Sequence, residues 1–195
     1  MTLVGSPTNF GVRPAAPHDA AGIAAVQAAA WSHDYADLLP SETLATYTGS
    51  GSAAVWERAI GAPADPSGRV LVAHDGDLVV GFLAWIGATD MDLSDRDVEI
   101  VEFAVDPGRR GQGHGSRLLA AWADLARAGY ADVGVCWLPV GSPAADFLSG
   151  AGFAPDGASR EVALTDDGRR TLALMRLATS LGAPPGPSAG APTDA

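Results

Sequence analysis

Several features that are common in other protein classes are scarce in this sequence. It contains one cysteine, Cys136, so it can form neither an internal disulfide bond nor a zinc site with several cysteine ligands. A single cysteine fits a reducing compartment. No run of about twenty apolar residues is present to span a bilayer, and no basic, apolar leader opens the chain. We therefore expect a cytoplasmic protein without a membrane partner.

Positive charge is scarce as well. Lys and Arg together number 12 against 23 Asp and Glu residues, which gives a net charge of −11. Nucleic-acid binding draws much of its affinity from clustered basic side chains, so we expect no nucleic-acid partner. An acidic surface favours cationic partners instead.

The composition is that of one folded domain. The chain has 195 residues and is 47% hydrophobic, which is enough for a sizeable core. Residues 1–9 are small, polar and interrupted by proline, and residues 179–195 are rich in Pro, Gly and Ala. We expect a flexible N-terminus at 1–9, a single domain at 10–178 and a disordered tail at 179–195.

The most informative stretch of the chain is Val98–Gly129. Its first eight residues, Val98–Val105, are mostly β-branched or apolar and end at an Asp-Pro-Gly turn, which predicts a buried strand. From Leu118 onward, apolar residues recur at three- and four-residue spacing, which predicts a helix that Gly129 can end. Between the strand and the helix the sequence reads RRGQGHGS.

This Gly-rich segment, residues 109–116, predicts an anion site. The alternating glycines Gly111, Gly113 and Gly115 remove the Cβ atoms that would keep a ligand from the backbone. The N–H groups of the first helical turn then face that ligand, beside two arginines. A tight turn into the helix is the simpler alternative. The Walker motif does not fit, because His114 stands where its lysine is required, and the dinucleotide fingerprint lacks a required glycine.

The same segment resembles the pyrophosphate-binding loop of the GCN5-related N-acetyltransferases (the GNAT family). That family's pattern is Gln/Arg-x-x-Gly-x-Gly/Ala at the start of a helix, and residues 110–115 fit it at every specified position after a Val-Asp-Pro lead-in. The resemblance extends from Val12 to about Leu177. It implies that the pyrophosphate of acetyl-CoA is held by Arg110, Gly111, Gln112, Gly113, His114, Gly115 and Ser116.

Apolar patterns predict about seven strands in the chain. These strands are expected at 10–13, 69–74, 78–86, 98–105, 132–138, 160–164 and 171–177. Helices are expected at 18–31, 40–47, 53–60 and 142–151, besides the one after the Gly-rich segment. The resemblance implies their arrangement, which is an α/β (α+β) fold with a mixed, mostly antiparallel sheet, splayed at the central strand and flanked by helices.

Two aromatic residues are candidates for the acceptor site. Trp31 and Tyr35, followed by Leu-Leu-Pro at 38–40, resemble a subgroup pattern between the family's first two helices. In the family this region borders the acceptor pocket, so the resemblance implies that both residues bind substrate. The alternative is that they are ordinary core aromatics.

Two glutamates on the central strand are candidates for the catalytic base. An amine must lose a proton to attack a thioester, and a carboxylate is the usual acceptor of that proton. Glu99 stands eleven residues before Arg110, the separation found in some histone-modifying relatives, so it ranks first and Glu102 second. Strand alternation puts the two on opposite faces, Glu102 sharing that of Ile100 and Ala104, so only one reaches the acceptor unless a bulge intervenes. The alternative to a catalytic role, for either residue, is that it is a solvated surface glutamate.

The other groups that the reaction needs are implied only in part. The resemblance implies a backbone N–H near Phe103, Ala104 and Val105 as the donor to the tetrahedral oxyanion. Leu148 replaces the tyrosine that the family commonly has at this position, which leaves the general acid unassigned. Water or Ser142 could donate the proton.

These features together predict an acetyl-CoA-dependent N-acetyltransferase without a metal. The expected acceptor is a primary amine of a cationic small molecule or peptide. Carboxylates attract cations, and Asp90, Asp92, Asp95 and Asp97 lead into the strand that carries the glutamates. A solvated acidic loop is the alternative for these four. The sequence allows a homodimer. Two other functions remain open, a non-catalytic acyl-CoA-binding regulatory domain and an interaction module that does not bind CoA.

Overall fold

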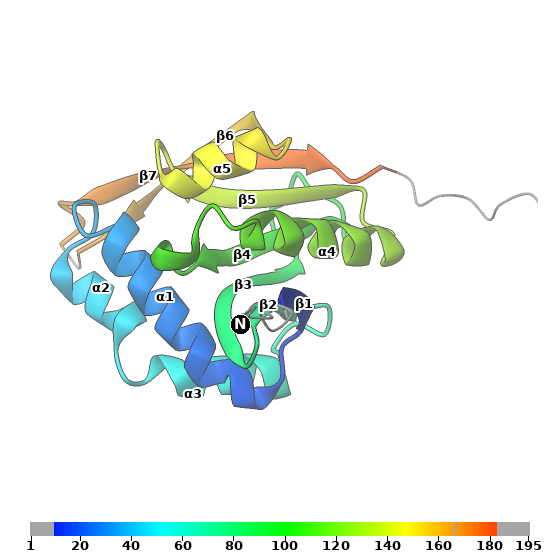
Figure 1. Cartoon of the computed structure of the whole chain (residues 1–195). Helices are drawn as coiled ribbons and strands as arrows, with labels where there is room; N and C mark the ends of the chain where they lie inside the picture. Colours follow the sequence, from blue (N-terminus) through cyan, green and yellow to red (C-terminus); the bar gives the residue numbers. More distant parts are fainter. Residues whose placement is uncertain (1–9, 166, 183–195) are drawn as a thin grey trace, which may run out of the picture.

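The computed structural model describes residues 10–165 and 167–182, which form a seven-stranded sheet in the order β1-β2-β3-β4-β5-β7-β6 (Figure 1). Neighbouring strands are antiparallel except β4 and β5, which are parallel. This confirms the predicted mixed, mostly antiparallel α/β sheet. The strands are β1 (Phe10–Pro14), β2 (Arg69–Asp75), β3 (Leu78–Gly87), β4 (Val98–Val105), β5 (Val133–Pro139), β6 (Ala154–Ala163) and β7 (Thr171–Ser180).

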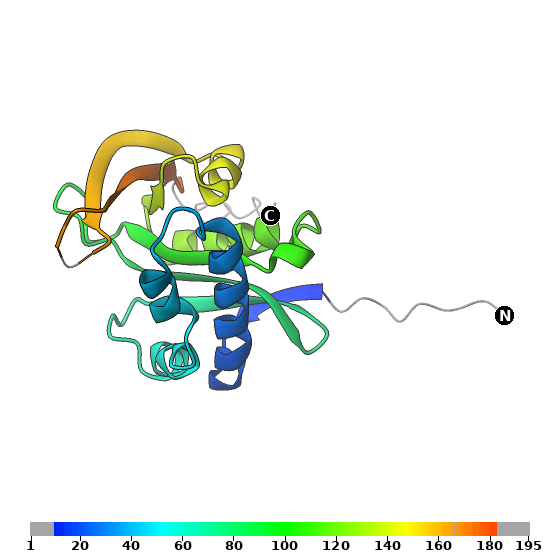
Figure 2. The same ribbon diagram turned by 90° about the vertical axis from the view of Figure 1, so that its left-hand side faces the viewer.

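Helices cover both faces of the sheet. They are α1 (Ala20–Asp34), α2 (Ser41–Thr48), α3 (Ser52–Gly61), α4 (His114–Ala128) and α5 (Pro143–Gly150), with 3-10 turns η1 (Pro17–Asp19) and η2 (Pro107–Arg109). Figure 2 shows α1, α2 and α3 together on one side of the sheet. Strand β2 alternates between the two cores, because Val72 packs with α1 and α3 while Leu71 and Ala73 pack with α4 and α5. In the described residues, the helices are too short or too polar to cross a membrane.

Strand β4 carries a bulge at Val101. Glu102 pairs with Ala84 of β3 and Ile100 pairs with the next residue, Trp85, so Val101 has no partner across the ladder. A bulge adds one residue to a strand and reverses the alternation of side chains beyond it. Ile100 accordingly packs on the α4 side of the sheet, while Ala104 packs on the α1 side.

The bulge overturns the predicted facing of the two glutamates. Strict alternation put Glu102 on the same face as Ile100 and opposite Glu99. In the structure, Glu102 lies on the α1 face, where it bonds Trp31. Glu99 directly precedes Ile100 and therefore points to that face too. Both carboxyl groups are on the α1 side of the sheet.

The sheet opens between its two parallel strands. Strands β4 and β5 are paired only at Val98–Gly134, Glu99–Val135 and Ile100–Cys136. Beyond Ile100, β4 remains paired with β3, and β5 remains paired with β7 as far as Pro139. This confirms the predicted splay at the central strand. The strand edges that separate there face each other across a gap in the ladder.

The ordered chain continues past residue 178, where we expected the domain to end. Strand β7 runs to Ser180, and Leu181 is buried. The backbone N–H of Leu181 donates to the carbonyl of Asp132 at 2.9 Å, and its carbonyl accepts from Nε of Arg127 at 2.6 Å. The predicted flexible segment 1–9 and residues 183–195 of the predicted tail lie outside the described residues. The structure also starts β6 at Ala154, six residues before the predicted strand.

Gly134→Ala should destabilise the fold. A Cβ at this position would lie 2.4 Å from Cη2 and 2.7 Å from Cζ2 of Trp122, whose ring is fully buried and stacks on Phe153. Overpacking of this kind costs about 1 to 3 kcal/mol of unfolding free energy, measured as a lower urea midpoint. Gly61→Ala in α3 is the control, since its Cβ would have no heavy atom within 4 Å. It should leave the midpoint unchanged or slightly raised. Equal midpoints for both variants would contradict the close contact.

Candidate active site

A cavity of about 390 Å³ lies where β4 has separated from β5. Its walls come from the end of α1, from β4, from the Gly-rich loop and from the start of α5. They are Trp31, Asp34, Tyr35, Glu102, Phe103, Ala104, Val105, Arg109, Arg110, Gly111, Gly113, His114, Gly115, Ser116, Pro143, Ala144 and Phe147. The structure thus brings most of the predicted site residues together. Among the described residues, two predicted ones, Glu99 and Gln112, do not line this cavity.

The Gly-rich loop leads from β4 into α4 through left-handed backbone. Gly111 has φ +75° and Gly113 has φ +80°, a region that other residues rarely adopt. Helix α4 begins at His114 with Gly113 as its N-cap, and no side chain caps it. The N–H groups of its first turn are therefore available to an anion.

Gly115 lets the start of α4 approach two stacked phenyl rings. Phe103 of β4 and Phe147 of α5 lie with ring centroids 5.5 Å apart and planes 19° from parallel. A Cβ on Gly115 would lie 3.0 Å from Phe147 and 3.3 Å from Phe103. These rings form an apolar wall directly beside the loop. A ligand bound at the loop would therefore extend along an apolar surface.

Arg110 of the loop is held by Asp34 of α1. Its Nη1 and Nη2 donate to the two carboxylate oxygens at 2.8 and 2.6 Å. The hydrogen bonds that Arg110 donates to Asp34 raise the pKa of Arg110, against the opposing effect of burial. Burial opposes ionisation of Asp34, but the hydrogen bonds from Arg110 and His33 outweigh it and lower the pKa of that carboxyl. Both groups are charged at neutral pH.

Glu102 is a half-buried carboxyl of the cavity wall that accepts a hydrogen bond from α1. Nε1 of Trp31 donates to its Oε1 at 2.7 Å. Burial raises the pKa of Glu102 to about 7, although hydrogen bonds to Trp31 and Gln27 favour the ionised form. Trp31 is itself fixed by Tyr35, edge-on at 5.4 Å, and by Tyr47, stacked at 4.2 Å. A carboxyl with a pKa near 7 can accept a proton at neutral pH.

Glu99 lies in a different environment on the same strand. It is half-buried opposite Val135 of β5. Burial and the charge of Asp90 raise its pKa, while Arg160 and Arg176 lower it. Its surroundings are therefore those of the charged residues on β6, β7 and the loop before β4.

Three carboxylates of the acidic loop before β4 make contacts within the protein. Arg176 is buried, and its guanidinium bonds Asp90 at 2.9 Å, Asp156 at 2.6 Å and both oxygens of Asp92. The carboxylate of Asp97 accepts backbone N–H groups at 2.8 and 3.1 Å. Asp90, Asp92 and Asp97 are thus held by internal contacts, and they do not line the cavity.

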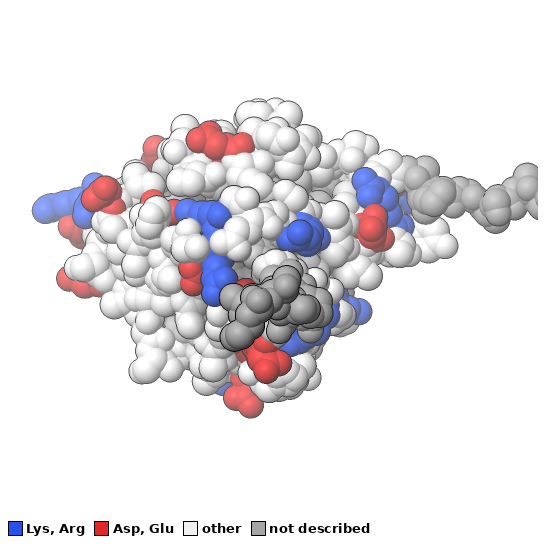
Figure 3. All heavy atoms as spheres, in the orientation of Figure 1, with Lys and Arg blue, Asp and Glu red and all other residues white. Residues whose placement is uncertain are grey.

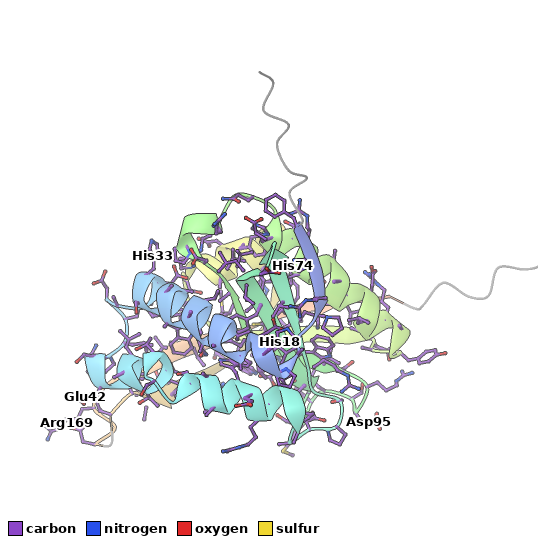
Figure 4. All side chains as sticks on the ribbon, turned by 60° about the horizontal axis from the view of Figure 1, so that its bottom comes forward. His18, His33, Glu42, His74, Asp95 and Arg169 are labelled. Atoms are coloured by element: carbon purple, nitrogen blue, oxygen red, sulfur yellow. The ribbon has the colours of Figure 1, made fainter. Side chains whose placement is uncertain are left out.

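Asp95 lies far from the loop that carries Arg110. Figure 4 puts Asp95 at the opposite side of the molecule from His33, which lies beside Asp34 at the end of α1. Asp95 therefore does not border this cavity.

Tyr35 supplies a phenol to the cavity wall. Burial raises its pKa to about 12, and the negative charges of Glu102 and Asp34 act in the same direction. The hydroxyl therefore stays protonated through the neutral range. Leu148, at the position of the family's tyrosine, is fully buried in the α4-side core. Ser142 caps α5 by accepting the N–H of Ala145 at 3.3 Å, so it serves the helix.

Comparison with known proteins identifies the architecture. Residues 66–155 match the family model of the acetyltransferase (GNAT) domain. The chain therefore contains a GNAT acetyltransferase domain match over these residues. Acetyl transfer is the general activity of that family. The comparison with curated proteins found no match.

Solved structures show the same GNAT fold. A GCN5-related N-acetyltransferase structure from Rhodopseudomonas palustris, whose description also reads "Aminotransferase, Class-II", has a TM-score of 0.67 at 23% identity, covering 92% of this chain and 99% of that one. The PaiA N-acetyltransferase of Thermoplasma acidophilum, in complex with coenzyme A, has a TM-score of 0.68 at 12% identity, covering 88% and 99%. The ribosomal-protein-S18-alanine N-acetyltransferase of Escherichia coli has 0.62 at 16%, covering 88% and 94%. At these identities the similarity concerns the fold.

Glu102→Gln should change how stability depends on pH. The folded-state pKa of Glu102, about 7, lies above the ordinary value of 4.5, so the folded protein retains a proton that the unfolded chain has lost. This contribution to stability is complete below about pH 4.5 and is lost as pH rises through about 7. Glutamine cannot ionise. The urea midpoint of the variant should therefore rise relative to that of the wild type when the pH is raised from 5 to 8. A difference that is the same at both pH values would show that Glu102 titrates normally.

Proposed function

We propose that this GNAT protein is an N-acetyltransferase that moves an acetyl group from acetyl-CoA to a primary amine of a cationic small molecule or peptide. One observation carries the proposal. An uncapped, Gly-rich helix start and a carboxyl with a pKa near 7 line the same cavity. The first suits a pyrophosphate and the second suits an amine that must lose a proton. The reaction needs acetyl-CoA as co-substrate, and we propose no metal for it.

The CoA part of the proposal rests on the loop and on the split in the sheet. Arg110, Gly111, Gln112, Gly113, His114, Gly115 and Ser116 are proposed to hold the pyrophosphate. Support comes from the left-handed glycines, the free first turn of α4 and the fold shared with a CoA-bound relative. Along residues 103–105, β4 is paired with β3 alone, so alternate backbone N–H groups on its other edge can donate to the oxyanion.

The proposed chemistry uses two side chains of the cavity. Glu102 accepts a proton from the amine, and the nitrogen attacks the thioester carbonyl carbon. Backbone N–H groups near Phe103, Ala104 and Val105 stabilise the tetrahedral oxyanion. The C–S bond then breaks, and the leaving thiolate takes a proton from the Tyr35 hydroxyl. The second proton on the nitrogen passes to the Tyr35 phenolate, which leaves the neutral amide, and Glu102 releases its proton to solvent. Trp31 and Tyr35 border the acceptor, and Trp31 holds Glu102 in place.

A cationic acceptor is the finer part of the proposal. Asp90 and Asp92 bond Arg176 and do not line the cavity, so support for a cationic acceptor comes from Glu102, a carboxyl in the cavity wall. Charged side chains of both signs are scattered over the face shown in Figure 3 without one large acidic patch. Selectivity for cations should therefore come from Glu102 in the cavity wall rather than from the whole surface.

The function is tested by following the release of CoA thiol from acetyl-CoA. The protein is mixed with neutral, monocationic and polycationic primary amines, and CoA binding is measured separately by calorimetry. Turnover with at least one primary amine, and more with cationic ones, is expected. CoA binding without turnover for any amine would favour the regulatory acyl-CoA-binding domain. Failure to bind CoA would favour the interaction module.

Glu102→Gln should depress kcat/KM at neutral pH by about a hundredfold, because the amine then has no base. The loss should shrink as pH rises and the acceptor deprotonates in solution. Glu99→Gln is the matched comparison, since it removes a half-buried carboxyl from the same strand. We expect it to stay near wild type. The opposite pattern would move the base to Glu99, which ranks first by its sequence separation from Arg110.

Tyr35→Phe should lower kcat by about tenfold, because a thiolate leaves less readily without a proton donor. CoA affinity should be unchanged, since the ring remains. Tyr47→Phe is the control, because this phenol also stacks on Trp31 but is absent from the cavity wall of the described residues. Steady-state kinetics and calorimetry would be run on both. Wild-type kcat in Tyr35→Phe would exclude the phenol as the donor.

A further inference from the structure

Arg110 takes part in an ion pair that the proposed reaction does not use. It belongs to the loop before α4, whereas its partner Asp34 ends α1, 76 residues earlier. The two Nη atoms bond the two carboxylate oxygens at 2.8 and 2.6 Å, and Nε donates to the carbonyl of Val105 at 3.3 Å. Every nitrogen of the guanidinium therefore has an acceptor within the protein. Both side chains line the cavity.

The pair is more than an incidental surface contact. The side chain of Asp34 is 10% exposed and that of Arg110 is 34% exposed. Bidentate, partly buried pairs are stronger and more fixed than exposed ones. Asp34 also stands at the C-terminal end of α1, where the helix dipole disfavours a carboxylate. Its charge is stabilised instead by Arg110 and by His33, whose Nδ1 lies 2.9 Å from Oδ1 of Asp34.

The Asp34–Arg110 pair opposes the binding of a pyrophosphate at the Gly-rich loop. A pyrophosphate is an anion, and Asp34 adds a negative charge to the wall of the same cavity. The guanidinium that would attract the phosphates is already neutralised by that carboxylate. An entering anion must share Arg110 with Asp34 or displace it, and like charges repel more strongly where water is excluded. Asp34 therefore costs affinity for any anion that uses Arg110.

We propose that Asp34 limits the affinity of the protein for coenzyme A by holding Arg110 as its counter-ion. The proposal rests on the proposed CoA site. Asp34 acts through Arg110 and is therefore a positioning residue. When the carboxylate is removed, the guanidinium is free to bond the pyrophosphate, and CoA is held more tightly. With Asp34 present, CoA leaves more readily after its acetyl group has been transferred.

Calorimetric titration of the full chain with coenzyme A tests this. Asp34→Asn replaces the carboxylate by a neutral amide of the same shape and should strengthen CoA binding by at least about threefold. If Asp34 only stabilised the loop, the substitution would weaken CoA binding, because damage to the loop weakens binding. Asp34→Ala also removes the charge and keeps a good helix former at the end of α1. It should show the same gain, including if the Asn variant fails to fold.

Two comparisons isolate the ion pair. The gain should disappear when Asp34→Asn is combined with Arg110→Gln, which closes a double-mutant cycle. Asp75→Asn is the matched control, because Asp75 pairs with the neighbouring Arg109 at 3.1 Å and Arg109 also lines the cavity. It removes an equal charge and should give no gain.

Several results would overturn the proposal. They are unchanged or weaker CoA binding in both Asp34 variants, a gain that persists without Arg110, and an equal gain from Asp75→Asn. A wild-type protein that fails to bind CoA would remove the CoA site itself, and this proposal with it. Wild-type binding without a gain in the Asp34 variants would remove the present proposal alone.

Discussion

The separation of β4 from β5 after Ile100 is the constraint on which the candidate active site depends. Each of the two strands keeps its other neighbour, β3 or β7, so the sheet stays intact on both sides of the gap. Backbone groups on the facing edges lose their strand partners, and buried backbone groups need partners. A bound ligand can supply them. The loop, α1 and α5 then close the space into a cavity, because all three meet at this point.

The bulge at Val101 decides which chemistry faces that cavity. One extra residue reverses the alternation of β4 and directs Glu102 toward α1. Burying a carboxyl is costly unless it is hydrogen-bonded, and Trp31 supplies such a bond. The balance between burial and hydrogen bonding leaves the pKa near 7. The fold thus disfavours the ionised form of Glu102 at a position where a proton acceptor is useful.

Net charge is a poor guide to the field at this site. The chain carries 11 more acidic than basic side chains, yet many carboxylates near the site have internal partners. Three of them surround Arg176, and Asp34 binds Arg110. The group around Arg176 does not line the cavity, and Asp34 faces a cation there, so the net charge of the chain does not describe the charge at the cavity wall. Glu102, bonded to neutral donors, is the exception.

The sequence alone determined the elements and the anion-binding loop. Apolar periodicity, turn residues and glycine spacing are local signals, so they identified the strand, the loop and the helix of residues 98–129 and about seven strands in all. Where those signals weaken, as in the Pro- and Gly-containing start of β6, the boundary was misplaced. The resemblance to a known family added the splay, which the structure confirms, and the expectation that the ligand is acetyl-CoA.

Only the tertiary structure decided which carboxylates line the cavity and which are paired. A bulge moves every later side chain of β4 to the other face, but Val101 looks like any strand residue. Trp31 and Glu102 are 71 residues apart, Asp34 and Arg110 are 76 apart, and Asp90 and Arg176 are 86 apart. No local spacing encodes such contacts, because they form when α1 and the loop before β4 pack against the finished sheet.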